Sequence, residues 1–245
     1  MELFAGTIDA LRILVEAAAC RRSWPADEKV QWPCGGGRNI VFKEDMALEL
    51  GSPETESVSC LLWTEDISCI DPGTVTMIGP DFTESHGRSL PFGKVVLLAV
   101  EGFSEDNAYE RHRDLDLLRY DLDLKGFMIR AVSQHMREWC RISRDALAQG
   151  LSAHVLGSSI IRLYRKTPYV KGVEIIFFTS SVHDVRRLGE ITAPSGLIVA
   201  AMNKMASEMD FECSSCDYRA VCGEAEGLKG MRDRLMDRSR RSVHG

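Results

Sequence analysis

The sequence predicts an α+β fold, in which a mixed sheet region has flanking helices and is followed by a C-terminal cysteine loop. Three features of the sequence support this prediction. Between residues 39 and 79, short apolar runs alternate with turn residues, a pattern typical of strands. Two nearly continuous apolar runs, at 94–100 and 173–179, are typical of buried strands. Segments with helical periodicity lie before, between and after these runs.

The first half of the chain is expected to contain one helix and then several strands. Apolar residues recur at helical spacing over 8–20, and Pro25 and the run Pro33-Cys34-Gly35-Gly36-Gly37 end that helix and form a loop. This glycine run precedes a strand instead of linking a strand to a helix, so its pattern is a poor match to an anion-binding nest. Short turns separate several of the strands that follow, so the region is expected to be antiparallel. The expected strands are 39–42, 47–50, 58–63 and 75–78.

The second half is expected to alternate helices with strands. Ser104 is expected to cap a charged helix over 105–121, and Ser143 to cap a second helix. A longer helix is expected over 152–166, and Pro194 is expected in the first turn of a last helix that reaches about residue 209. The expected strands in this half are 94–100, 126–132, 139–142 and 173–179. Three regions are therefore expected: 1–36, 37–210 and 211–245.

The composition is that of an ordinary globular protein. The chain has 245 residues, a net charge of −6 and 44% hydrophobic residues, which argues against nucleic-acid or membrane-surface binding over the chain as a whole. The start of the sequence has no signal-peptide pattern and no run of 18 apolar residues occurs, so a cytoplasmic location is expected. The eight cysteines are then expected to be thiols and metal ligands instead of disulfides.

Three cysteines near the end of the sequence carry the strongest chemical signal. Cys213, Cys216 and Cys222 are spaced C-x2-C-x5-C, and this spacing lets one short loop wrap thiolates around a metal centre. A [4Fe–4S] cluster is expected, with a zinc site as the alternative. Both sites take four ligands, and no cysteine follows Cys222 in this sequence. The histidines show no metal-binding spacing, and there is no G-x-S-x-G nucleophile motif.

The fourth ligand is left open by the sequence. Some nucleases build a four-cysteine cluster from such a run and one distant upstream cysteine, a precedent for geometry alone that points to Cys34 in its glycine-rich loop. Cys140, next to Trp139, is the other candidate within the chain. A partner chain is a further source. Without a protein ligand, one iron would be open to a small ligand.

Several runs in the middle of the chain resemble a known family when their order and spacing are taken together. The first three are Ile40-Val-Phe-Lys-Glu-Asp-Met-Ala-Leu-Glu-Leu-Gly51, Val75-Thr-Met-Ile-Gly-Pro-Asp81 and Leu90-Pro-Phe-Gly-Lys-Val-Val96. The later ones are Trp139-Cys-Arg-Ile-Ser-Arg144, His154-Val-Leu-Gly157 and Val173-Glu-Ile-Ile-Phe-Phe-Thr179. They resemble the middle domain of the acetyl-CoA synthase β subunit of the carbon monoxide dehydrogenase complex. The resemblance is expected to run from about Gly37 to Cys222.

The resemblance implies a cluster-binding segment without the family's nickel site. In the family, the full subunit joins a methyl group, carbon monoxide and coenzyme A at a [4Fe–4S] cluster bridged to two nickel ions, and a Cys-Gly-Cys segment binds the outer nickel. This sequence contains no Cys-Gly-Cys, and its third cysteine follows the second at a shorter distance than in the family. The resemblance also implies that Trp139, Arg141 and Arg144 contact coenzyme A, since the family's middle domain uses a tryptophan and arginines there.

The expected function is that of an iron–sulfur-binding accessory or electron-transfer protein in the one-carbon or corrinoid metabolism of an anaerobe, acting with a protein partner. One alternative is a coenzyme A-dependent acyl or methyl transferase. Another is a zinc-stapled module whose basic tail, residues 229–241, binds a protein. The sequence does not decide whether the chain is an enzyme, and it leaves a homo-oligomer open.

Overall fold

The computed structural model describes residues 2–27, 29–37, 39–85, 89–132, 136–207 and 216–243. The helices are α1 (Ala5–Glu16), α2 (Ala108–Leu117), α3 (Arg144–Ala148), α4 (Ala153–Tyr164), α5 (Val182–Ser207), α6 (Arg219–Glu224) and α7 (Glu226–Val243), with 3-10 turns at Ile67–Cys69, Phe82–Glu84 and Leu118–Asp121. The strands are β1 (Arg21–Pro25), β2 (Met46–Leu50), β3 (Ser57–Thr64), β4 (Thr74–Ile78), β5 (Ser89–Leu90), β6 (Phe92–Val100), β7 (Phe127–Val132), β8 (Glu138–Ser143) and β9 (Val170–Phe178). Within these described ranges, no helix is long and apolar enough to cross a membrane.

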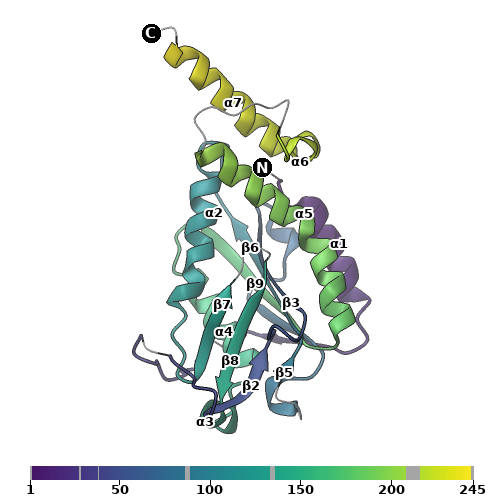
Figure 1. Cartoon of the computed structure of the whole chain (residues 1–245), viewed down its shortest axis with the longest axis vertical. Helices are drawn as coiled ribbons and strands as arrows, with labels where there is room; N and C mark the ends of the chain where they lie inside the picture. The colour runs from purple at the N-terminus through teal and green to yellow at the C-terminus, as the bar shows by residue number, and fades with distance from the viewer. Residues whose placement is uncertain are drawn as a thin grey trace.

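The strands form two mixed sheets (Figure 1). The larger sheet has the order β1-β4-β9-β6-β3, in which β4 is parallel to β9 and β6 is parallel to β3, while the other pairs are antiparallel. The smaller sheet has the order β5-β2-β8-β7, with β5 parallel to β2 and the other pairs antiparallel. The two mixed sheets with their helices confirm the predicted α+β class.

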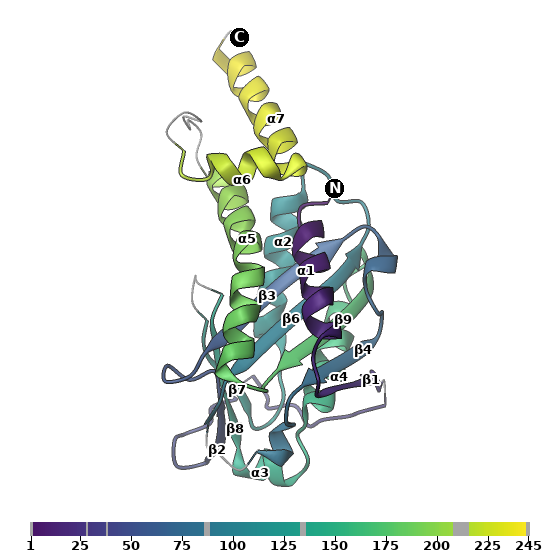
Figure 2. The same cartoon turned by 90° about the vertical axis from the view of Figure 1, so that its right-hand side faces the viewer.

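Helices cover both faces of the larger sheet. α1 and α5 lie side by side over one face (Figure 2), and α4 packs on β4 and β9 from the other face. Gly93 of β6 permits the close approach of α5, because a Cβ atom added there would lie 2.7 Å from Leu188 Cδ2. Gly157 of α4 plays the same part against Val75 on the opposite face, where an added Cβ would lie 2.6 Å from Val75 Cγ1. Small residues thus set the spacing of the layers.

A buried ion pair joins the two sheets. The Lys94 ammonium group on β6 lies 2.5 Å and 2.6 Å from the two carboxylate oxygens of Glu138 on β8, and both side chains are almost fully buried. Ser59 Oγ donates to the same carboxylate at 3.1 Å, and Ser57 Oγ donates to the Glu138 main-chain carbonyl at 2.6 Å. Burial would raise the pKa of Glu138, but the charges of Lys94 and Arg119 and these hydrogen bonds hold that pKa below its ordinary value.

The glycine run after Pro33 is fastened to the body of the protein by one carboxylate. The main-chain N–H groups of Gly35, Gly36 and Gly37 donate to Asp123 at 2.9 to 3.1 Å, and Asn39 Nδ2 donates to the same group at 2.6 Å. Gly36 and Gly37 have φ angles of 73° and 72°, and a residue with a side chain would be strained at these values. The run therefore forms an anion-binding nest, although its sequence pattern is a poor match to one. The anion that it binds is the Asp123 carboxylate of the same chain.

The predicted elements from β6 to β9 lie within a few residues of those observed, but several other predictions are wrong. Residues 39–42 form no strand. β2, β3 and β4 do not pair with one another, so the antiparallel arrangement predicted for them is wrong. Pro194 lies in the interior of α5 instead of its first turn. Asn107, not Ser104, occupies the N-cap position of α2. The expected loop and tail after residue 216 contain α6 and α7.

Replacing Lys94 by Met is expected to destabilise the protein by about 3–5 kcal/mol, because it leaves the buried Glu138 carboxylate without its counter-charge. The Lys94→Met/Glu138→Leu double variant is expected to be more stable than the Lys94→Met single variant, since neither charge then remains buried. Urea unfolding followed by circular dichroism measures both free energies. A single variant as stable as the wild type would contradict the role of the pair.

The same pair makes stability depend on pH. Because the folded protein holds the pKa of Glu138 below its ordinary value of 4.5, the stabilisation is fully present above that value and is lost as the pH falls through the folded pKa. The wild type is therefore expected to lose more stability between neutral pH and acid than the double variant, in urea unfolding at matched pH values. Parallel curves for the two proteins would contradict this.

Candidate functional site

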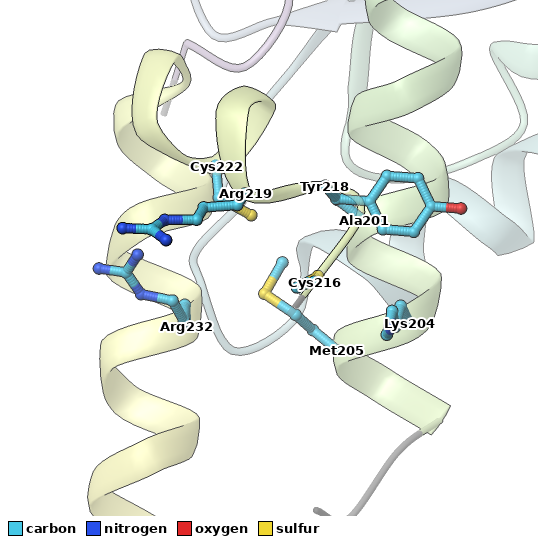
Figure 3. A pocket seen from close by; sticks show the side chains of 8 residues that line it. All are labelled: Ala201, Lys204, Met205, Cys216, Tyr218, Arg219, Cys222 and Arg232. Atoms are coloured by element: carbon cyan, nitrogen blue, oxygen red, sulfur yellow. The ribbon is translucent and has the colours of Figure 1, made fainter. Parts of the chain in front are cut away.

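Two of the three clustered cysteines line one hollow near the C-terminal end of the chain (Figure 3). We call it the cysteine hollow; its lining residues are Ala201, Lys204, Met205, Cys216, Tyr218, Arg219, Cys222 and Arg232. Cys222 is buried and Cys216 is half-buried. Cys213, the first cysteine of the motif, lies outside the described residues. The structure thus brings the second and third cysteines of the motif to one place.

The local chain path explains why Cys216 and Cys222 line the same hollow. The N–H of Arg219 donates to the Cys216 carbonyl at 3.1 Å, which closes a tight turn directly before α6. The N–H of Cys222 then donates to the Tyr218 carbonyl at 3.0 Å within α6. The turn and the single helical turn that follows carry both thiols toward Met205 of α5, as Figure 3 shows.

Three cationic side chains line the same hollow as the two cysteines. Lys204 of α5, Arg219 of α6 and Arg232 of α7 all line the cysteine hollow. Arg232 also forms an ion pair with Asp233 at 2.8 Å. Cationic groups favour thiolates over thiols, and thiolates are the form that binds iron or zinc. Apolar contacts from Ala201 and Met205 complete the lining. The donor atoms and the charge of the hollow therefore fit a thiolate-ligated metal centre.

Cys34 lies elsewhere in the fold. It is exposed and lines a separate hollow together with Asp45, Lys125 and Arg144. Among the described residues, no three side chains of the metal-binding types cluster, although Cys34, Cys216 and Cys222 are all described. The structure therefore does not bring Cys34 to the cysteine hollow within one chain.

Cys140, the alternative fourth ligand, is part of the core between the sheets. Its side chain is fully buried on β8, and its Sγ donates to Glu138 at 3.5 Å. Burial, together with the negative charge of Glu138, raises the pKa of this thiol well above its ordinary value. A metal ligand must be a thiolate, so Cys140 is a poor ligand for structural reasons.

Trp139 lies on the opposite side of β8 from Glu138 and Cys140, because successive strand residues face opposite ways. Two guanidinium groups lie over its indole ring: Arg130 at 4.3 Å and Arg141 at 5.5 Å from the ring centroid. The indole Nε1 has no hydrogen-bond partner in the described structure. This arrangement leaves an indole donor beside two cations.

Arg141 and Arg144, the other residues expected at this site, differ in setting. Arg141 is buried and is held by Glu49 at 2.8 Å and by the Val41 carbonyl at 3.4 Å. Arg144 is exposed and lines the hollow that contains Cys34, which Trp139 does not line. The structure therefore brings Arg141 to Trp139 and places Arg144 in a different hollow.

Sequence reasoning missed Arg130. It lies on β7, and β7 pairs with β8 through a register shift between Ile129 and Ala131, which sets Arg130 beside Trp139. The pairing of β7 with β8 could have revealed that Arg130 lies beside Trp139. The sequence, however, does not show the register shift between Ile129 and Ala131. The cationic lining of the cysteine hollow was missed as well, because Lys204 and Arg232 lie on separate helices.

Comparison with known proteins finds relatives that match the middle of this chain. The family described as the CO dehydrogenase/acetyl-CoA synthase complex beta subunit matches residues 35–183. This match begins where the resemblance was expected to begin, but it ends before the cysteine motif, which was expected to be included. The chain is also similar to the acetyl-CoA decarbonylase/synthase complex subunit beta of Methanopyrus kandleri, with 31% identity over 140 residues.

That alignment covers 55% of this chain and 28% of the relative, so the chain corresponds to only a part of the relative's length. The family match, in contrast, covers more than half of this chain. It includes β2 to β9 and the helices between them, which make up most of both sheets. The chain therefore belongs to the family of CO dehydrogenase/acetyl-CoA synthase complex beta subunits.

Proposed function

We propose that this chain is an iron–sulfur-binding protein of its family, with a [4Fe–4S] cluster held by Cys213, Cys216 and Cys222. The observation that carries the proposal is the cysteine hollow, which two cysteines of the motif line together with three cationic side chains. When bound, the cluster would supply one-electron transfer. The family and the named relative supply the context, so the proposed role is that of an accessory or electron-transfer protein in one-carbon or corrinoid metabolism.

The residues around the thiols would serve the cluster in two ways. Arg219, Lys204 and Arg232 would offset the negative charge of the thiolate ligands of a bound cluster. Met205 and Ala201 exclude water from one side of the hollow. Solvent exposure, charge and hydrogen bonds near the sulfur atoms are the features that set the reduction potential of such a centre.

The fourth ligand is proposed to come from outside the cysteine hollow of the same chain. Cys34 lines another hollow, and Cys140 is buried beside the Glu138 carboxylate. A partner chain, including Cys34 of a second copy, or a small molecule then completes the site. An iron without a protein ligand would be open to exchange. Zinc is the alternative metal, because three thiolates and one exogenous ligand also suit its tetrahedral geometry.

The complete reaction of the named relative is not proposed for this chain alone. The chain aligns with 28% of the relative's length, and the sequence contains no Cys-Gly-Cys segment. What is proposed is the part that the described residues support: the family's middle domain followed by a thiolate site. A protein partner is part of this proposal, because the relative is named as a subunit of a complex.

A second candidate function is coenzyme A binding at Trp139, in support of an acyl or methyl transfer step. The observation that favours it is the indole ring with two guanidinium groups over it and an unpartnered Nε1. Arg141 is fixed by Glu49, while Arg130 is exposed and can move to admit an adenine ring or bind a phosphate group. Arg144 lines a separate hollow, so it would contact coenzyme A only if the bound molecule extended from Trp139 into that hollow.

Anaerobic purification is expected to yield a brown protein with about four irons per chain, as a [4Fe–4S] cluster requires. Replacing Cys216 by Ser is expected to abolish most of the iron and the visible absorbance. The matched control is Cys69→Ser, which changes another partly buried cysteine that is bonded to Asp66 and should leave the iron content unchanged. A colourless protein with stoichiometric zinc by metal analysis would contradict the cluster.

Replacing Cys34 by Ser is expected to leave the iron content unchanged in a monomeric sample, because Cys34 lines a different hollow from Cys216 and Cys222. Iron analysis of size-fractionated protein measures this. If iron is lost only from a dimeric fraction, Cys34 is a ligand supplied by a second copy. Loss of iron from the monomer would show that Cys34 reaches the site within one chain.

Coenzyme A at millimolar concentration is expected to quench the emission of Trp139, since an adenine ring would stack near the indole. The chain has four tryptophans, so the Trp139→Phe variant supplies the baseline, and the difference between the two proteins isolates Trp139. Arg130→Ala is expected to weaken the response. Identical titrations of the wild type and the Trp139→Phe variant would remove the support for a transferase.

A further inference from the structure

A wide groove lies where α1, α5, α6 and the start of α7 come together. Part of its lining is apolar and accessible: Pro194 of α5 is exposed, and Ile191 and Val221 are half-buried. The groove has a volume of about 1120 Å³, which exceeds the roughly 300–1,000 Å³ of typical small-molecule pockets. It is therefore large enough to hold a segment of polypeptide.

Glutamate side chains make this groove acidic. Glu2, Glu190 and Glu224 are exposed, and within the part of the chain that the structure describes they form no ion pair. A fourth glutamate, Glu105, pairs with Arg234, which also lines the groove. Four glutamates and one arginine give the lining a net charge of −3, half of the net charge of −6 of the whole chain. An occupant with both apolar side chains and positive charge would complement this groove.

Pro194 adds a feature that also suits a cationic occupant. It lies inside α5 and has no N–H, so it supplies no hydrogen-bond donor to the Glu190 carbonyl four residues earlier. Both residues line the groove. An arginine side chain of the occupant can donate to that carbonyl, because a guanidinium group carries five N–H bonds and accepts none. The main chain of α5 thus adds an acceptor to the negative charge of the glutamates.

The first half of α7 is fastened to the body of the protein next to the groove. Leu228 and Met231 are buried, and Arg234 forms ion pairs of 2.5 Å with Glu105 and 2.9 Å with Asp106. The helix has 18 residues and is therefore about 27 Å long. Its second half projects beyond the rest of the fold in both views (Figures 1 and 2). This half points away from the groove of its own chain.

The sequence of the second half of α7 has the chemistry that the groove requires. It combines positive charge with apolar residues, and one of the latter, Met236, is exposed. The charged residues after position 234 are Asp237, Arg238, Arg240 and Arg241, and the apolar ones are Leu235, Met236 and Val243. A second molecule can therefore offer a basic, partly apolar helix to the acidic groove.

We propose that the groove binds the second half of α7 of a second copy of this chain, so that two molecules form a symmetric dimer. In this dimer the two α7 helices lie antiparallel, and the end of each meets the start of the other, which is where the groove lies. The same contact is then made twice, as two-fold symmetry requires. Neither the groove lining nor α7 contains a cysteine, so the dimer does not depend on a metal.

Sedimentation equilibrium of the full chain tests the proposal. The wild type is expected to dimerise at submillimolar concentration, and more weakly as salt is added, because salt screens the charges. Glu190→Lys is expected to weaken dimerisation roughly tenfold or more, since it brings like charges together. Glu16→Lys makes the same change at an exposed position of α1 outside the groove and is expected to have no effect. A monomeric wild type, or unchanged dimerisation of folded Glu190→Lys, would overturn the proposal.

A charge exchange between two variants tests whether α7 is the occupant. The first variant, Glu190→Lys/Glu224→Lys, reverses the charge of the groove, and the second, Arg238→Glu/Arg241→Glu, reverses the charge of the helix. Each alone is expected to be monomeric. Their mixture is expected to form a heterodimer, because each groove then faces a helix of opposite charge.

Two controls accompany the exchange. Circular dichroism checks that both variants fold, and iron analysis of the same samples shows whether the cysteine hollow is affected separately. Absence of a heterodimer in the mixture of folded variants would overturn the assignment of α7 as the occupant.

Discussion

The Glu138 carboxylate is the group on which the arrangement of the two sheets depends. It lies at the start of β8 in the smaller sheet, yet its partners are on strands of the larger one: Lys94 on β6 and Ser59 on β3. Arg119, from the 3-10 turn after α2, adds a third contact at 3.8 Å. A buried carboxylate tolerates few alternative positions, because each would leave a charge without a partner. This requirement fixes how β8 sits against β3 and β6.

That position of β8 has direct consequences for the candidate sites. With Glu138 turned inward, the alternation of the strand turns Trp139 and Arg141 to the other side, where Arg130 meets them. Burial lowers the pKa of His112, and the positive charge of Arg119 lowers it further, so the charges around Glu138 also act on the core side of α2. α5 then connects the regions, since it packs on β3 and β6 of the larger sheet and its last turns form one wall of the cysteine hollow.

Local features of this chain could be predicted from the sequence, while pairing could not. The cap at Ser143 follows from a serine hydroxyl that accepts a main-chain N–H three residues later. The buried strands β6 and β9 follow from apolar runs. β3, however, pairs with β6 and not with its neighbours in sequence, because the partner is selected by long-range packing. The cysteine motif was visible from its spacing, whereas Arg130 required a strand register that only the fold supplies.

The two edges of the larger sheet limit how copies of this protein can associate. β1 forms one edge. It begins with two arginines, whose charge disfavours pairing with another strand, and it ends with Pro25, which has no N–H to donate. β3 forms the other edge, where Ser59 N–H already donates to the Met136 carbonyl at 2.5 Å. Strand addition from a second molecule is therefore disfavoured at both edges. An assembly of this protein, with itself or with another subunit, is therefore not expected to extend the larger sheet.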